Sequence, residues 1–316
     1  MRSLNRCFAD VTPYTRFSFL NFFSYIHGDD HLFKVTRLRS RKYKAFHPHQ
    51  IYIPLQVSQT EDDRNERKRA MIEAEIRNRI KLMKMSYQKA NAMDAPFLQE
   101  IADEFEENAQ FDGAVLTGHG RFFSAGLNLV SLSHGTTDDV KTVFTALANV
   151  LKNVMTFPGP VIAVVNGHAV AGGCLLALCC DYRIGVAGDY KMGINEMAIG
   201  LDLPPLGLAV VRRSVATNHL FDIASLGKFY TPDDAVSVGL LNELADADSA
   251  VELALEKAER MAATLAPFQR LKERMLQPET ELLTKESGSV DEFVDQWFAP
   301  ETQAKIKEAV ARLKGS

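Results

Sequence analysis

The sequence predicts an α/β fold, and three observations lead to this prediction. Short apolar runs rich in β-branched residues, typical of buried strands, recur along the middle of the chain. Segments with apolar residues at helical spacing lie between these runs. The last part of the chain shows helical spacing alone. Alternating strands and helices followed by helices predict an α/β core with a helical C-terminal region.

Composition limits the class of protein. The 316 residues can bury a substantial core, and 46% hydrophobic with 24% charged residues is ordinary for a globular protein. No apolar run approaches the roughly 20 residues needed to cross a bilayer, so we expect no membrane span. Three of the four cysteines, Cys174, Cys179 and Cys180, fall in one predicted buried helix. We interpret them as small apolar side chains rather than metal or redox ligands.

Residues 1–60 differ from the rest of the chain in charge. They hold nine Lys and Arg against three Asp and Glu, a balance of +6. Since the net charge of the whole chain is −4, the remaining residues carry −10. Arginine, serine and phenylalanine with few acids are consistent with a transit peptide. The basic run 37–44 with its aromatic residues is also compatible with nucleic-acid contact. We favour a basic N-terminal extension over residues 1–70, either a transit peptide, a disordered leader or an over-long reading frame, and expect no nucleic-acid partner.

The predicted core begins at Met71. Alternating residues on both sides of a turn at 77–79 predict a β-hairpin between Met71 and Met85. Asp94 is suited to cap a helix over residues 96–107. A strand is predicted over 113–117, and helical segments are predicted over residues 138–156, 206–215, 249–266, 268–276 and 290–313.

The stretch Gly159–Gly207 has the pattern of a strand, a glycine turn and a buried helix. Residues 160–165 are an apolar run, Asn166-Gly167 interrupts it, and Ala171-Gly172-Gly173 precedes the apolar segment 174–180. Glycines at the start of a helix let another group approach the backbone, and the first N–H groups of a helix have no partner within it. Such a site can bind an anion, or an oxygen that becomes negative during a reaction.

Two motifs resemble those of the crotonase family, the enoyl-CoA hydratases and isomerases. One is NGHAVAGGCLLALCCDYRI over residues 166–184, followed by GINEMAIGL over 193–201, and the other is VLTGHGRFFSAGLNL over 115–129. The resemblance extends from about Met71 to the C-terminus. It implies a crotonase-type spiral of ββα units over residues 71–250 and a C-terminal helical trimerisation region over 251–316. The implied assembly is a homotrimer or a dimer of trimers.

The resemblance also implies a site for an acyl-CoA thioester. Its oxyanion hole maps to the backbone N–H groups of Ala125 and Gly172, and its acid/base carboxylate maps to Glu196. A carboxyl in an apolar pocket has its pKa raised towards neutrality, which suits proton transfer near pH 7. The other residues that the resemblance places around the substrate are Ala90, Ala92, Ser124, Gly126, Leu127, His168, Gly173, Leu175 and Pro204. For His168 we expect packing or hydrogen bonding rather than proton chemistry. No metal or other cofactor is expected, since CoA is part of the substrate.

Leu175 departs from the pattern of the family's hydratases, which have a second glutamate at this position. With one base left, moving a proton from one carbon to another is favoured over holding and adding a water. The Gly-Ile-Asn-Glu sequence at 193–196 also resembles the Δ3,Δ2-enoyl-CoA isomerases of fatty-acid oxidation. We therefore expect an isomerase, mitochondrial in a eukaryote and cytoplasmic otherwise. The alternatives are hydration or another acyl-CoA reaction, and a non-catalytic protein that binds acyl-CoA or RNA.

Overall fold

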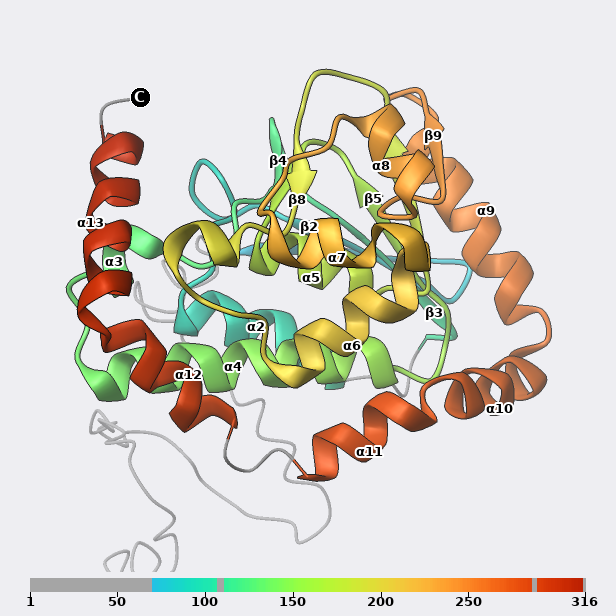
Figure 1. Ribbon diagram of the computed structural model, residues 1–316. Coiled ribbons are helices and arrows are strands. Elements are labelled where there is room, and N and C mark those ends of the chain that lie inside the picture. Colours follow the sequence, from blue (N-terminus) through green and yellow to red (C-terminus); the bar gives the residue numbers. More distant parts are fainter. Residues whose placement is uncertain (1–69, 107–110, 286–288, 315–316) are drawn as a thin grey trace, which may run out of the picture. The chain divides into compact units, whose positions relative to one another are not determined.

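The computed structural model describes residues 70–106, 111–285 and 289–314 (Figure 1). All of these residues belong to one compact unit, Gln59–Ser316. The predictions for the basic N-terminal extension fall on residues outside the described ranges. Within those ranges, no helix is both long and apolar enough to cross a membrane.

Two sheets form the core of the described chain. In spatial order the larger sheet contains β1 (Ile72–Arg77), β2 (Ile80–Met85), β3 (Gly113–Thr117), β5 (Val161–Val165), β7 (Tyr182–Val186) and β9 (Glu243–Ala245). The smaller sheet contains β4 (Phe122–Ser124), β6 (His168–Val170) and β8 (Met192–Gly193). β1 and β2 form the predicted antiparallel hairpin. The other neighbouring strands are parallel.

Successive segments of the chain repeat a ββα pattern. Each sends a strand to the larger sheet, a short strand to the smaller sheet, and then a helix. The repeats are β3, β4 and α4 (Thr137–Thr156), then β5, β6 and α5 (Gly172–Cys179), then β7, β8 and α6 (Pro205–Ser214). Because β4, β6 and β8 are parallel neighbours, the turns that follow them lie side by side at one end of the smaller sheet.

Strand β5 explains why the predicted core strands lack polar positions. Val161, Ala163 and Val165 pack into the main core with residues of α4 and α5. Ile162 and Val164 face a second core formed with α9 (Ala250–Ala262). A parallel strand that is covered on both faces has no exposed position, so its sequence is an unbroken apolar run.

The other helices include the segments predicted over 96–107, 268–276 and 290–313, and several short helices that the sequence analysis did not predict. They are α2 (Ala95–Glu106), α3 (Leu129–Leu132), α7 (Leu220–Ser225), α8 (Pro232–Val238), α10 (Leu265–Met275), α11 (Gln277–Lys285), α12 (Ser289–Phe298) and α13 (Pro300–Lys314), with the 3-10 turns η5 (Glu196–Ile199) and η6 (Thr217–His219). Asp94 caps α2 as predicted, because its Oδ1 accepts the Phe97 N–H at 3.2 Å. The helical segment predicted over 290–313 divides into α12 and α13 at Pro300, which has no N–H to continue a helix but suits a first turn.

The C-terminal helices α12 and α13 pack on elements of their own chain (Figure 1). Phe293 and Trp297 of α12 contact the Phe144 ring of α4 in tilted, edge-on geometry, at centroid distances of 4.5 and 5.7 Å. Lys141 and Asp291 form an ion pair of 2.6 Å between the same two helices. α13 contacts η5 and α3. The two helices therefore close over η5, α3 and α4, while their role in trimerisation stays a prediction.

Candidate active site

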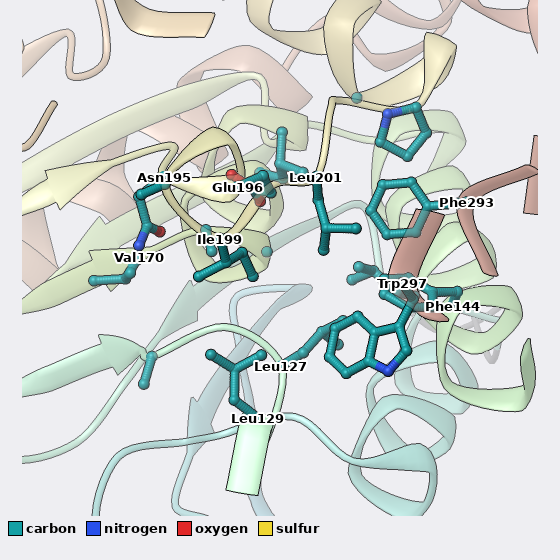
Figure 2. Close-up of a pocket in the computed structure, with 18 of the residues that line it drawn as sticks. Leu127, Leu129, Phe144, Val170, Asn195, Glu196, Ile199, Leu201, Phe293 and Trp297 are labelled. Carbon is teal, nitrogen blue, oxygen red and sulfur yellow. The ribbon is translucent and has the colours of Figure 1, made fainter. Parts of the chain in front are cut away.

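Glu196 is the first residue of η5 and follows strand β8 after two residues. It lines a cavity of about 380 Å³ (Figure 2). Its carboxyl Oε2 is buried and has no hydrogen-bond partner among the described residues. A buried polar atom without a partner is costly unless a proton or a ligand meets it. The predicted acid/base residue therefore lines the cavity and has one buried carboxyl oxygen without a partner among the described residues.

Burial raises the pKa of Glu196 to about 7, because the charged carboxylate loses its solvation. Hydrogen bonds from the backbone N–H groups of Asn195 and Glu196 act in the opposite direction, and burial outweighs them. The apolar neighbours Ile194 and Leu201 are themselves buried. A carboxyl with a pKa near 7 can both accept and return a proton at neutral pH.

The turn after β4, residues 124–127, lies against the turn that leads into α5. Gly126 adopts a φ of +81°, and a Cβ at this position would lie 2.7 Å from the Val170 carbonyl oxygen. Both the backbone conformation and the space therefore require glycine. The same Cβ would lie 3.3 Å from the backbone nitrogen of Gly172, so the two turns are in direct contact.

The structure corrects the predicted oxyanion donor in this turn. The N–H of Ala125 donates a hydrogen bond to the Ala90 carbonyl oxygen at 3.0 Å, so it is not free for a ligand. The N–H of Leu127, on the other side of Gly126, has no partner in the described part of the chain. Sequence spacing could not distinguish the two, because the direction of each N–H depends on the backbone conformation of the turn, where Gly126 adopts a φ of +81°.

The second predicted donor, the N–H of Gly172, is free in the described part of the chain, and its role as a donor stays a prediction. Gly172 is the first residue of α5, so its N–H has no partner within the helix. No hydrogen bond occupies it elsewhere in the described ranges. Leu127 and Gly172 both line the cavity. Two free amides therefore belong to adjacent turns whose residues line one cavity, and a pair of such amides can stabilise a negative oxygen.

Asn91, which the sequence analysis did not single out, supports the first turn. Its side-chain Nδ2 donates to the Phe123 carbonyl at 3.0 Å, and its own carbonyl accepts the Ser124 hydroxyl at 2.7 Å. The Ser124 oxygen also accepts the Gly126 N–H at 3.1 Å. Ser124, predicted to contact substrate, is thus fully buried and holds the shape of the turn.

The predicted substrate-binding residues divide into two groups. Leu127, Leu175 and Pro204 line the cavity, together with the predicted catalytic residues Ala125, Gly172 and Glu196. Those that do not are Ala90, Ala92, Ser124, Gly126, His168 and Gly173. Gly173 is packed so closely on Ser124 that a Cβ would overlap the serine carbonyl. Contact of the second group with the CoA part of a ligand stays a prediction.

His168 is the first residue of strand β6. Its Nδ1 accepts the Lys191 N–H at 3.1 Å, and its ring packs on Phe122 at a centroid distance of 5.0 Å. Burial and the nearby Arg121 lower its pKa, which favours the neutral ring. The side chain packs and hydrogen-bonds away from the cavity.

The cavity wall is apolar along most of its length. Helices α4, α5, α6 and α12 contribute the side chains of Phe144, Leu147, Leu151, Leu175, Leu206, Phe293 and Trp297. In Figure 2 the rings of Phe144, Phe293 and Trp297 gather at one side of the cavity, away from Val170 and Asn195. The sequence analysis missed Phe293, because α12 lies about a hundred residues beyond Glu196 and no local pattern links the two.

Glu196 is the only carboxyl on this wall among the described residues, where the other charged or amide side chains are Asn195 and Arg312. Leu175, which stands where the family's hydratases are expected to have a second glutamate, is 4% exposed and lines the cavity. The described part of the site therefore combines one carboxyl of raised pKa with two free amides in apolar surroundings.

Comparison with known proteins identifies the family to which the chain belongs. The model of the enoyl-CoA hydratase/isomerase family matches residues 75–312. A putative enoyl-CoA hydratase from Thermus thermophilus is 31% identical over 182 residues, which cover 57% of this chain and 71% of that protein. Human mitochondrial enoyl-CoA delta isomerase 1 is 24% identical over 253 residues, 78% of this chain and 84% of that protein.

Solved structures share the fold. The crystal structure of human mitochondrial Δ3-Δ2-enoyl-CoA isomerase has a TM-score of 0.74 at 24% identity, covering 78% of this chain and 99% of that one. An enoyl-CoA hydratase from Bacillus halodurans has a TM-score of 0.68 at 18% identity, covering 76% of this chain and 100% of that one. The extent of the family match and the shared fold lead to one conclusion: this chain is an enzyme of the enoyl-CoA hydratase/isomerase, or crotonase, family.

Proposed function

We propose that this protein is an enoyl-CoA isomerase, which moves the double bond of a 3-enoyl-CoA to the trans-2 position. The observation that carries the proposal is that Glu196, with a pKa of about 7, is the only carboxyl among the described residues that line the cavity. The neighbouring Leu175 can neither hold nor activate a water. One base beside two free amides favours moving a proton between carbons over adding water.

In the proposed reaction the thioester oxygen accepts hydrogen bonds from the N–H groups of Leu127 and Gly172. The Glu196 carboxylate removes a proton from C2, and the electron pair of that C–H bond forms a dienolate. The two amides stabilise the negative oxygen of the dienolate. The neutral carboxyl then gives its proton to C4, and the double bond moves from C3–C4 to C2–C3. Protons and electrons balance, and Glu196 returns to its starting state.

Hydration of a 2-enoyl-CoA is the second candidate. It is favoured by the 31% identity to the putative hydratase of Thermus thermophilus, against 24% to the human isomerase. A mitochondrial location in a eukaryote and a trimeric assembly are further proposals. The first is supported by the similarity to a human mitochondrial protein, and the second by the family resemblance of the sequence.

The decisive experiment supplies the purified full chain with 3-enoyl-CoA and, separately, with trans-2-enoyl-CoA. We expect the first to be converted into the second, with little hydration of either. Hydration that is faster than isomerisation would replace the isomerase proposal with the hydratase. Binding of both thioesters without turnover would point to another acyl-CoA reaction or to a binding protein.

The rate of isomerisation is expected to rise with pH and to reach half of its maximum near pH 7. Only the carboxylate form of Glu196 can remove the C2 proton, and burial raises the pKa of this group from its ordinary value to about 7. Below that pH the carboxyl is neutral and cannot start the reaction. The measurement is kcat/KM for 3-enoyl-CoA between about pH 5 and about pH 9. A midpoint near 4.5 would show that the carboxylate is solvated in the working enzyme.

A further inference from the structure

Thr302 is a buried polar residue of α13 to which the proposed reaction assigns no role. It is 2% exposed and lies with Ile306 and Val310 on the buried face of the helix. Its hydroxyl donates a hydrogen bond to the carbonyl oxygen of Gly200, 102 residues earlier in the chain, at 3.2 Å. Gly200 ends the turn η5, which begins at Glu196. A side chain of the C-terminal helix therefore reaches the turn that carries the candidate acid/base residue.

Backbone hydrogen bonds close this turn around Glu196. The Glu196 carbonyl accepts the Leu201 N–H at 3.1 Å, and the Met197 carbonyl accepts the Gly200 N–H at 3.1 Å. Glu196, Ile199 and Leu201 all line the cavity (Figure 2). Because these bonds connect Gly200 to the residues at the start of the turn, a displacement of Gly200 is expected to displace Glu196 as well.

Within the described ranges, the Thr302 hydroxyl is the only donor to the Gly200 carbonyl. Carbonyl groups at the end of a helical turn have no partner within it. The contact with α13 is also close, since a Cβ on Gly200 would lie 3.2 Å from the Thr302 Oγ1 and 3.4 Å from the Lys305 Cδ. Removing the hydroxyl therefore leaves this carbonyl without a partner among the described residues, and the end of the turn loses a contact that fixes it on α13.

We propose that Thr302 is a positioning residue that holds the turn η5, and with it the Glu196 carboxyl, in the geometry needed for proton transfer. The inference rests on the proposed function in one respect, the role of Glu196 as the acid/base group. A displacement of about 1 Å at a reacting group can cost roughly 10²-fold in rate. The amides of Leu127 and Gly172 belong to other turns, so Thr302 acts on proton transfer and not on binding of the thioester.

The kinetic test compares valine, which keeps the branched shape of Thr302 and removes the hydroxyl, with serine, which keeps the hydroxyl. We expect Thr302→Val in the full chain to lower kcat for 3-enoyl-CoA about tenfold and to change KM by less than about twofold. Thr302→Ser is expected to keep most of the kcat, because the donor is retained. If valine prevents folding, Thr302→Ser and Thr302→Ala, which differ only in the hydroxyl, give the same comparison.

A second measurement follows the turn itself. Hydrogen exchange of the backbone amides, read by mass spectrometry, reports local opening of a segment. In Thr302→Val we expect exchange at residues 196–201 to be about three- to tenfold faster, the effect of one hydrogen bond. Exchange at residues 124–127, which belong to the turn after β4, is expected to stay unchanged.

The matched control is Thr117→Val. The Thr117 hydroxyl also donates to a backbone carbonyl, that of Val164, at 3.0 Å, and Thr117 is 6% exposed but does not line the cavity. We expect this variant to lose about as much thermal stability as Thr302→Val and to keep its kcat. Equal losses of kcat in the two valine variants, or an unchanged kcat in Thr302→Val, overturn the inference. A folded Thr302→Ser that is as slow as the valine variant overturns it too.

The exchange measurement separates this inference from the proposed function, because it does not depend on turnover. Unchanged exchange at 196–201 in Thr302→Val overturns only the role of Thr302. An unmodified protein that hydrates 2-enoyl-CoA without isomerising 3-enoyl-CoA overturns only the isomerase, and the variants are then compared by kcat for hydration. A protein that turns over neither thioester overturns the proposed function, and exchange at 196–201 then decides alone whether Thr302 holds the turn.

Discussion

Replacing Glu196 with glutamine is expected to lower kcat for 3-enoyl-CoA isomerisation by about 10³- to 10⁴-fold, near the upper end of what general acid–base catalysis contributes. Glutamine fills the same space but cannot take the C2 proton, and no second carboxyl lines the cavity among the described residues. KM is expected to change little, because the amides of Leu127 and Gly172 still bind the thioester. Steady-state kinetics with Glu256→Gln, a change on an exposed position of α9, as control will measure this effect.

The same variant has a predicted effect on stability with a definite sign. Folding raises the pKa of the Glu196 carboxyl from 4.5 to about 7, so the folded state favours the neutral form. Its contribution to stability is complete below about pH 4.5 and is lost as the pH rises through 7. As the pH rises from about 4.5 to above 7, the free energy of unfolding of Glu196→Gln should therefore increase relative to that of the unmodified protein, by up to about 3 kcal/mol. Thermal unfolding at several pH values measures this difference. If the stability of the inactive variant relative to the unmodified protein falls between pH 5 and pH 8, its loss of activity comes from a structural defect.

Replacing Gly126 with alanine is expected to lower kcat/KM by about 10²- to 10³-fold, the usual effect of losing one oxyanion donor. The new Cβ would lie 2.7 Å from the Val170 carbonyl oxygen and 3.2 Å from the Ala171 Cβ, at a φ of +81°. The turn must shift to relieve this overlap, and the Leu127 N–H that follows it moves away from Gly172. The measurement is kcat/KM for 3-enoyl-CoA, together with the melting temperature.

Gly120→Ala separates strain from steric overlap. Gly120 also has a positive φ, of +56°, but a Cβ there meets no atom within 4 Å. This control is expected to lose about 1 kcal/mol of stability and to keep its activity. Equal losses of activity in the two variants would show that backbone strain, and not the position of the Leu127 amide, limits the reaction.

Local elements could be predicted where one physical signal dominates a short segment. The apolar run of β5 is unbroken because both faces of the sheet are covered. Asp94 caps α2 because its side chain reaches an N–H three residues away. The raised pKa of Glu196 could also be anticipated, because its segment of the sequence is largely apolar and holds the buried residues Ile194 and Leu201.

The candidate oxyanion hole shows where sequence reasoning fails. The motif points to the turn at 124–127, but the N–H of Ala125 is taken by the Ala90 carbonyl, 35 residues earlier in the chain. Neither residue's type indicates that bond, because the two groups involved belong to the backbone. The aromatic side of the cavity was missed for a similar reason. Phe293 and Trp297 reach it only because α12 packs on α4.

By itself the sequence determined the strand, glycine turn and buried helix of the 159–180 segment, because each depends on residues close together in the chain. The ββα repeat followed from the family resemblance, and the acid/base role of Glu196 stays a prediction. Only the tertiary structure decided which backbone N–H groups stay free among the described residues, which helices close the cavity, and that the Oε2 of Glu196 has no hydrogen-bond partner there. Those properties depend on which distant segment takes up a hydrogen bond or covers an apolar surface. Contacts between residues far apart in the chain cannot be predicted from the local sequence.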